Sequence, residues 1–426
     1  MHGNWISGMH PHRHRSGIAV SPAPILLFLG ILVCILTGCG DGDASNGERT
    51  VLRLWHFWSE PAQRAVLQQQ IADFQRKHPF VVVELTELQW SDGKAKLQLA
   101  FNSGNPPDVV HIGMEWIPQF AAAGVLGRLS DDNADRFLPG ARSGGIFGDS
   151  TVALPWVVNT RALMMQTTLH EARSGKTMLD VIRAYHDPAR GRYGFGIASN
   201  EPHNVMKRVL PFMIAGGSKA FLSRPYWSTL DDSAVVALER YVSFCDYGIN
   251  ESSRNLDERF VRGDVGVWVS GAWILASAAR TGRSASFTVL DGIFPLTDIA
   301  TAHHGSILSG DYLAVSNASV HRHEAMLLID YLTSDNTALA FCEAIPDAGV
   351  PAGRQALDTM RERLQDANAI AFCDAVEQAP SIEQSVHFLD AERIFEEEVM
   401  MAIYRKKTAR QAVADARDRI RSVETR

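Results

Sequence analysis

Strand-like and helix-like patterns alternate along the first third of the chain. Residues 51–57, 80–85 and 108–112 are short runs rich in Val, Leu, Ile and Phe, which favour buried β-strands. Between the first two runs, Leu67 and Ile71 belong to a set of apolar residues at helical spacing. Strands that alternate with helices predict an α/β fold, in which a mainly parallel sheet is covered by helices on both faces.

The same alternation continues through the rest of the chain. Further strands are predicted at 151–158, 263–268 and 311–315, and we expect the last of these to return to the first lobe. The segment 216–230 predicts a hairpin, and the amphipathic segment 382–421 predicts closing helices of a second lobe. A chain of 426 residues is too long for one compact core, so we expect two lobes.

The first 40 residues have the pattern of an export signal. A basic segment without acidic residues precedes an apolar run over residues 25–36, which is shorter than the roughly 20 residues that a membrane-spanning helix needs. The run ends in Leu-Thr-Gly-Cys, which resembles a bacterial lipobox and implies cleavage before Cys39 and lipid on its thiol. The alternative is an uncleaved anchor. We expect an exported protein held by lipid to a membrane, facing the periplasm or the cell exterior.

These patterns predict the division of the chain. The predicted parts are a signal peptide at 1–38, a lipidated tether at 39–50, a first lobe at 51–158 and 303–341, and a second lobe at 159–302 and 342–426. Each lobe is expected to hold its own sheet, with the chain crossing between the lobes near the end of the strand at 151–158.

Charge and cysteine content exclude several classes of function. The formal net charge is -7, and the predicted signal peptide removes two arginines, so nucleic acid is not an expected partner. Cys245, Cys342 and Cys373 contain no CxxC pair, and a disulfide between the last two is left open. The histidines at 303–323 do not have zinc-ligand spacing. We therefore expect neither metal nor cofactor.

Seven stretches along the chain carry a family resemblance when taken together. They are Leu54-Trp55-His56-Phe57-Trp58-Ser59; Ile71-Ala72-Asp73-Phe74 with His78-Pro79; Asn102-Ser103-Gly104-Asn105-Pro106-Pro107-Asp108-Val109-Val110; Leu154-Pro155-Trp156 with Asn159-Thr160-Arg161; Val267-Trp268-Val269-Ser270-Gly271-Ala272-Trp273; Ser309-Gly310-Asp311-Tyr312-Leu313-Ala314-Val315; and Gly349-Val350-Pro351-Ala352-Gly353-Arg354. In this order the set resembles family 1 extracellular solute-binding proteins over residues 51–421.

The resemblance implies a type II periplasmic-binding-protein fold. Two α/β lobes would be joined by crossing strands, with a ligand cleft that closes on binding. Maltose-binding and related members deliver sugars to ATP-driven importers, and some relatives bind glycerol phosphate or glycerol phosphodiesters. One departure is the stretch Leu-Met-Met-Gln at 163–166, where many members have a Tyr-Tyr-Asn-Lys-type strand.

A carbohydrate site needs aromatic platforms for C–H faces and fixed polar groups for hydroxyls. In α/β sheets such groups gather beyond the carboxyl ends of strands. The residues at such positions, or within the family-like stretches, are Trp58, Ser59, Glu115, Trp116, Trp156, Asn159, Arg161, Ser270, Trp273, Asp311 and Arg354. Asn204, in the predicted helix at 201–215, is a further candidate.

Most of these candidates also have a structural interpretation. The alternatives are core packing for Trp58 and Trp273, a helix N-terminal carboxylate for Glu115, hinge hydrogen bonds for Asn159 and Arg161, and salt bridges for Asp311 and Arg354. The resemblance favours Trp273 as the best single platform. Trp90 is assigned to surface packing and Trp227 to the hairpin.

The expected function is that of a monomeric substrate-binding lipoprotein of an importer. It would capture a mono- or oligosaccharide by hinge closure and deliver it to the permease subunits, without catalysis. A glycerol phosphate or glycerophosphodiester ligand is the first alternative. The second is a cleft enzyme acting on glycosides, with Glu115 and Asp311 as its carboxylate pair. The third is a structural or adhesive surface lipoprotein.

Overall fold

The computed structural model describes residues 49–130, 134–199, 201–290 and 304–425. The predicted signal peptide, Cys39 and nearly all of the tether therefore lie outside the described residues. No helix in the described part of the chain combines the length and the apolar character that crossing a membrane requires.

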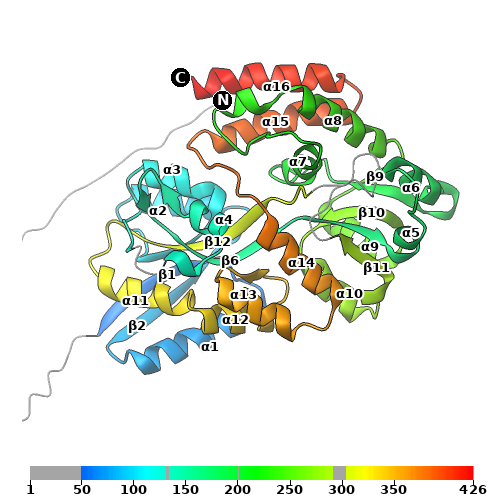
Figure 1. Ribbon diagram of the computed structural model, residues 1–426. Helices are drawn as coiled ribbons and strands as arrows, with labels where there is room; N and C mark the ends of the chain where they lie inside the picture. Colours follow the sequence, from blue (N-terminus) through cyan, green and yellow to red (C-terminus); the bar gives the residue numbers. More distant parts are fainter. Residues whose placement is uncertain (1–48, 131–133, 200, 291–303, 426) are drawn as a thin grey trace, which may run out of the picture. The chain divides into compact units, whose positions relative to one another are not determined.

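The first lobe is built on a six-stranded mixed sheet (Figure 1). Its strands, in spatial order, are β13 (Val350–Pro351), β6 (Leu154–Thr160), β12 (Leu308–Val315), β3 (Val109–Gly113), β1 (Thr50–His56) and β2 (Val81–Glu87). β1 pairs in parallel with β2 and β3, whereas β12 runs antiparallel to both β3 and β6. Residues 311–315, which were expected to return to the first lobe, belong to β12 in this sheet.

Helices cover this sheet because their buried stripes match its apolar faces. They are α1 (Pro61–Lys77), α2 (Gly93–Asn102), α3 (Ile117–Ala122), α4 (Pro139–Gly144), α11 (Arg322–Leu332), α12 (Asp335–Ala344) and α13 (Arg354–Arg363), with a short hairpin of β4 (Ile146–Phe147) and β5 (Ser150–Thr151). In α1, Pro61 occupies the first turn, and Leu67, Ile71 and Phe74 are buried at the predicted helical spacing.

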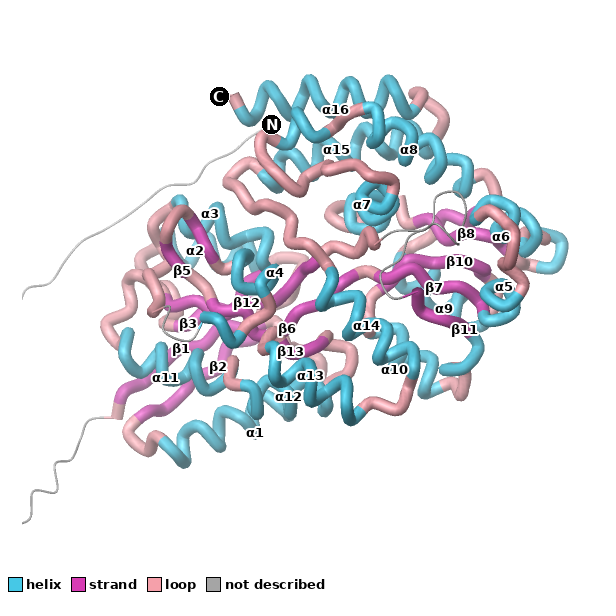
Figure 2. The backbone as a smooth tube through the Cα atoms, viewed as in Figure 1, coloured by secondary structure: helices cyan, strands magenta, loops and turns pink. Residues whose placement is uncertain are grey.

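The second lobe is built on a five-stranded sheet. Its strands, in spatial order, are β11 (Phe287–Leu290), β7 (Ala162–Gln166), β10 (Val265–Ser270), β8 (Tyr193–Ile197) and β9 (Gly248–Asn250). The helices of this part are α5 (Thr167–Glu171), α6 (Met178–Tyr185), α7 (Met206–Ala215), α8 (Asp232–Cys245), α9 (Ser253–Arg262), α10 (Trp273–Arg280), α14 (Ala367–Gln378), α15 (Phe388–Ile403) and α16 (Ala409–Glu424) (Figure 2).

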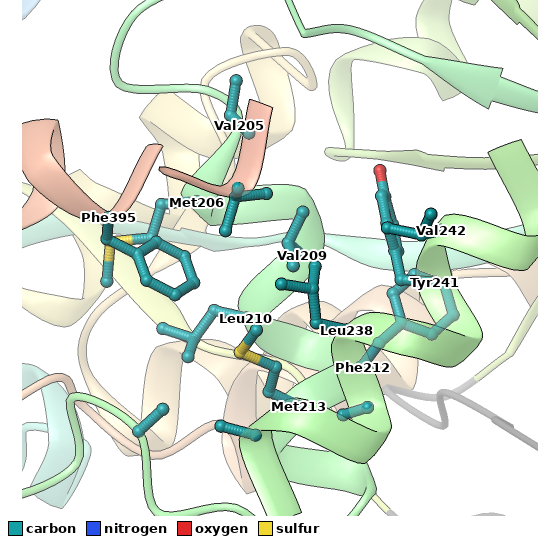
Figure 3. Packing of buried hydrophobic residues seen from close by; sticks show 14 of the residues in the cluster. Val205, Met206, Val209, Leu210, Phe212, Met213, Leu238, Tyr241, Val242 and Phe395 are labelled. Atoms are coloured by element: carbon teal, nitrogen blue, oxygen red, sulfur yellow. The ribbon is translucent and has the colours of Figure 1, made fainter. Parts of the chain in front are cut away.

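The core of the second lobe joins helices that are distant in sequence. Figure 3 shows Leu210 and Met213 of α7 beside Leu238 of α8, with Phe395 of α15 in the same cluster. α16 packs on both α15 and α8. The predicted closing helices therefore complete the core that the strands and α6–α8 begin.

The chain passes between the sheets with little connecting backbone. Arg161 alone separates β6 from β7, so one residue joins the two sheets. The Ser306 hydroxyl donates to the Arg161 carbonyl oxygen at 3.2 Å, and the Thr160 hydroxyl donates to that of Ile307 at 2.8 Å. A further segment after α14 runs alongside, because the Leu308 N–H donates to the carbonyl oxygen of Pro380. These bonds hold the crossing segments together beside the cleft.

Two expectations about the chain's organisation differ from the structure. Residues 350–351 pair with β6, and α13 packs on α12 and β13, so the segment 342–363 lies with the first sheet instead of the second lobe. The hairpin expected at 216–230 is wrong: that segment holds turns and a short 3-10 helix. Phe221 and Tyr226 stack there with ring centroids 5.1 Å apart, and side-chain burial in the core replaces strand pairing.

The described cysteines are free. Cys342 and Cys373 are buried and Cys245 is half-buried, so the disulfide that the sequence left open is not formed. Burial raises the pKa of Cys373 to about 11 and raises the pKa values of Cys245 and Cys342 further. The three thiols therefore stay protonated and unreactive at neutral pH.

Candidate ligand-binding site

An open cleft of about 340 Å³ lies beside the crossing segments. This size falls within the roughly 300–1,000 Å³ that small-molecule sites occupy. Residues from both lobes line it, namely Trp58, Gln63, Trp90, Gly113, Glu115, Asn159, Arg161, Lys207, Trp273, Ser309, Gly310, Asp311, Asp347 and Ala348. Aromatic rings, carboxylates and cations therefore face one space.

Trp90 supplies an aromatic surface open to the cleft. It follows β2, and 47% of its surface is exposed. Its ring stacks on that of Phe57 at a centroid distance of 4.2 Å. It also packs at a tilt against the ring of Trp116, at a centroid distance of 5.3 Å. Because this packing fixes the indole while leaving it accessible, Trp90 can cover the apolar face of a ligand without a large loss of side-chain entropy.

A chain of hydrogen bonds orients the Asp311 carboxylate. The Phe57 N–H donates to His111 Nδ1 at 3.1 Å, so the ring proton of a neutral imidazole resides on Nε2, which donates to Asp311 Oδ1 at 3.0 Å. The register of β12 against β6 shifts between Asp311 and Tyr312, a bulge that redirects the side chain. With Oδ1 engaged, the second carboxylate oxygen remains an acceptor for a ligand hydroxyl.

Arg161 and Trp273 form a stacked pair. The guanidinium carbon of Arg161 lies over the indole at 4.4 Å from the ring centroid. Asp257 fixes that indole, because it accepts from Trp273 Nε1 at 2.8 Å as well as from the Trp268 indole and the Ser270 hydroxyl. Burial lowers the pKa of Arg161 to about 9, and the nearby charge of Arg208 acts in the same direction. Arg161 is thus a positioned cation in poorly hydrated surroundings.

Glu115 and Lys207 meet across the cleft. Glu115 follows β3 of the first lobe, Lys207 is in the first turn of α7 of the second, and Lys207 Nζ is 3.5 Å from Glu115 Oε1. Burial alone would raise the pKa of the Glu115 carboxyl, but the charge of Lys207 and a backbone hydrogen bond outweigh it and lower the pKa. Glu115 is therefore ionised at neutral pH, and the pair links the lobes.

The structure brings half of the predicted site residues to the cleft. Trp58, Glu115, Asn159, Arg161, Trp273 and Asp311 line it, whereas Ser59, Trp116, Trp156, Asn204, Ser270 and Arg354 do not. Trp58 is only 5% exposed and packs on Trp156 and Phe341, so most of its ring belongs to the core.

The six residues outside the lining have structural positions. Trp156 is fully buried, Trp116 supports Phe57 and Trp90, and the Ser270 hydroxyl donates to Asp257. Ser59 lies just after β1, the Asn204 carbonyl oxygen accepts from Arg208 just before α7, and Arg354 is exposed at the start of α13.

Sequence reasoning missed six side chains of the lining. They are Gln63, Trp90, Lys207, Ser309, Asp347 and Ala348. Trp90 follows β2 much as Trp58 follows β1, so the rule of strand carboxyl ends could have found it. Lys207 and Asp347 carry no such signal, because tertiary packing alone brings them to the cleft. Within the described ranges, no three His, Cys, Asp or Glu side chains gather as metal ligands.

Two sheet-based lobes, crossing strands and a cleft between them define a two-lobed binding protein of the α/β class. The model of the bacterial extracellular solute-binding protein family matches residues 58–338. This chain belongs to that family, and the predicted membership and fold class are confirmed.

Related proteins agree with this membership. An uncharacterized lipoprotein of Streptomyces antibioticus is 28% identical over 33% of this chain and 32% of its own length. A maltotriose-binding protein of Pyrococcus abyssi is 27% identical over 36% of this chain and 34% of its own length. The chain thus spans about a third of the length of these curated relatives. A solute-binding protein of Thermotoga lettingae, bound with α-D-tagatose, superposes with a TM-score of 0.74 at 18% identity, covering 88% of this chain and 99% of that one.

Proposed function

We propose that this protein captures a carbohydrate and delivers it to the permease of an ATP-driven importer. The observation that carries the proposal is the cleft itself, where the exposed ring of Trp90 faces the same space as Asp311 and Arg161. A sugar combines an apolar C–H face with a ring of hydroxyls, and this combination matches an aromatic surface bordered by fixed acceptors and donors. The 27% identical maltotriose-binding relative supports the same ligand class.

The polar groups of the cleft would recognise the sugar hydroxyls, some as hydrogen-bond acceptors and others as donors. Asp311 offers its second carboxylate oxygen as an acceptor, while Lys207 and Arg161 offer N–H donors. Charge-assisted hydrogen bonds of this kind are roughly twice as strong as neutral ones. Since His111 holds Asp311 in place before binding, little ordering of that side chain remains to be done.

Closure would couple capture to delivery. A ligand that touches residues of both lobes stabilises the closed arrangement, and Glu115 with Lys207 adds an ion pair between the lobes. The importer would then recognise the closed form. Lipid on Cys39 would keep the protein at a membrane, in line with the lipoprotein description of the Streptomyces antibioticus relative.

Thermal unfolding against a ligand panel tests the proposal. The panel holds monosaccharides, maltose, maltotriose, polyols, glycerol phosphates and divalent metals. A ligand at a concentration about 100 times its dissociation constant increases the free energy of unfolding by about 2.7 kcal/mol. This increase raises the melting temperature by several degrees. Stabilisation by saccharides supports the proposal. Stabilisation by divalent metals alone, or turnover of a glycoside, contradicts it.

A glycerol phosphate ligand is the second candidate, and Arg161 is the observation that favours it. The guanidinium matches a phosphate oxygen pair. A glycerol chain, however, has no flat ring face for Trp90. Stabilisation by glycerol 3-phosphate and by none of the saccharides would keep the capture mechanism and replace the carbohydrate.

A further inference from the structure

The two acids whose charges act on Arg161, Asp257 and Glu115, have other partners. Asp257 accepts three hydrogen bonds from Trp268, Ser270 and Trp273, and Glu115 faces Lys207. The remaining acid of the adjoining pocket, Glu392, pairs with His203. Among the described residues no ion pair joins Arg161 to an acid, although Asp311 and Asp347 line the same cleft.

Arg161 itself has unused donors. Its Nε–H is buried and has no hydrogen-bond partner among the described residues. Burying a hydrogen-bond donor without a partner lowers the stability of the folded state, and burying a cation without a partner lowers it more. A ligand or an ordered water can supply the acceptor that such a group lacks.

The surroundings of Arg161 strengthen its electrostatic attraction to a negatively charged partner. The guanidinium lies on Trp273, and stacking leaves its N–H edge free for a planar partner. A small pocket of about 20 Å³ continues from the cleft at Glu115, Arg161, Lys207 and Ser309. Its other walls are mainly apolar, among them Ile307 and Phe388. Apolar walls lower the local dielectric and make an ion pair stronger than it is in water.

We infer that the captured carbohydrate carries an anionic group, a carboxylate or a phosphate ester, which pairs with the stacked guanidinium of Arg161. Lys207 provides a second positive charge in the same part of the lining. The sugar ring extends toward Trp90, and its hydroxyls reach Asp311. This inference rests on the proposed function and narrows its ligand to acidic saccharides.

Matched pairs of ligands test the inference by calorimetric titration of the purified full chain. The pairs are D-glucuronate with D-glucose, D-galacturonate with D-galactose, and glucose 6-phosphate with glucose, joined by glycerol 3-phosphate and maltotriose. We expect at least one acidic sugar to bind about tenfold to a hundredfold more tightly than its neutral partner. The pair that shows the difference distinguishes a carboxylate from a phosphate ester.

Variants assign the difference to Arg161. Arg161→Gln removes the charge but keeps donors, and we expect it to abolish the preference for the acidic sugar. Arg161→Lys keeps the positive charge but lacks the planar guanidinium, and we expect it to retain only part of the preference. Arg240→Gln, on the exposed surface of α8, is the matched control and keeps the full preference. Circular dichroism and the melting temperature establish that each variant is folded.

Each outcome separates the inference from the function on which it rests. Neutral sugars that bind as tightly as their acidic partners overturn the inference and leave carbohydrate capture standing. An equal loss of acidic and neutral binding in Arg161→Gln also overturns it. Binding of glycerol 3-phosphate alone retains the anion contact but contradicts the carbohydrate. Binding of no ligand among those titrated contradicts both proposals.

Discussion

At the scale of single residues, the tryptophans of the first lobe occupy two kinds of position. Trp156 has no exposed surface and packs between Trp58 and Phe341. Trp90 lies at the other extreme, stacked on Phe57 with nearly half of its surface open to the cleft. The first therefore contributes to stability, and the second is available to a ligand.

Substitution of these two tryptophans should separate folding from binding. Trp156→Ala removes a large side chain from the core and should lower the free energy of unfolding by about 3–5 kcal/mol. Trp90→Ala should change it by less than about 1 kcal/mol and should weaken saccharide binding by about tenfold or more. Urea unfolding and calorimetric titration measure the two effects. A Trp90→Ala variant with unchanged affinity would remove Trp90 from the site.

Burial explains which site residues the sequence could predict. Family-like stretches located Arg161 and Asp311, and the predicted strand at 108–112 located Glu115, which follows it. The same stretches also proposed Trp156, which packs inward. A pattern along one chain shows that an aromatic residue is near a strand end, but which neighbours cover it depends on residues such as Phe341, 185 positions further on.

At the scale of elements, α15 holds the start of α7 in place. Glu396 of α15 accepts from the backbone N–H of Met206 at 2.9 Å and of His203 at 2.8 Å. The His203 ring meets Glu392 of α15 at 2.6 Å. Because Lys207 follows directly in α7, these contacts position the side chain that faces Glu115.

The contact between His203 and Glu392 makes the stability depend on pH. The hydrogen bond with Glu392 raises the pKa of His203 above its usual 6.5, with Glu396 acting in the same direction and burial and Lys207 opposing. A raised pKa means that the folded state binds the proton more tightly. The stabilisation is therefore complete below the unfolded pKa and is lost as the pH rises through the folded pKa.

A pH series of urea unfolding tests this dependence. Between about pH 6 and pH 8.5 the free energy of unfolding should decrease in the natural protein and decrease less in His203→Asn. Asn suits this position because His203 has a left-handed φ of 65°, which Asn tolerates. Equal slopes in the two proteins would mean that His203 does not contribute.

Local patterns predicted most elements but not every assignment to a lobe. The alternation of apolar residues located β1, β2, β3 and β12, because strands of four to eight residues bury their side chains in a regular way. β13 has only two residues and lies beyond any such pattern, so the segment around it was placed in the wrong lobe. The aromatic pair at 221 and 226 was mistaken for strand residues because only tertiary packing determines its role.

At the scale of the whole molecule, the ion pair between Glu115 and Lys207 links the lobes. Both side chains are about one quarter exposed, and such pairs contribute about 0–1 kcal/mol. Lys207→Met should therefore shift the ligand-free protein modestly toward an open form. Small-angle scattering should record a larger radius of gyration without ligand and recovery at saturating saccharide. An unchanged radius in the variant would exclude a role for the pair in closure.

The central place of β12 in the first sheet also predicts an order of folding. The second sheet is continuous in sequence, from β7 to β11, whereas the first sheet has a gap between β6 and β3 until residues 308–315 arrive. Contacts that close long loops form late. Pulsed hydrogen exchange during refolding should protect β7, β8 and β10 before β3 and β6. We therefore expect the cleft, and with it any ligand affinity, to form only after β12 has inserted between β6 and β3.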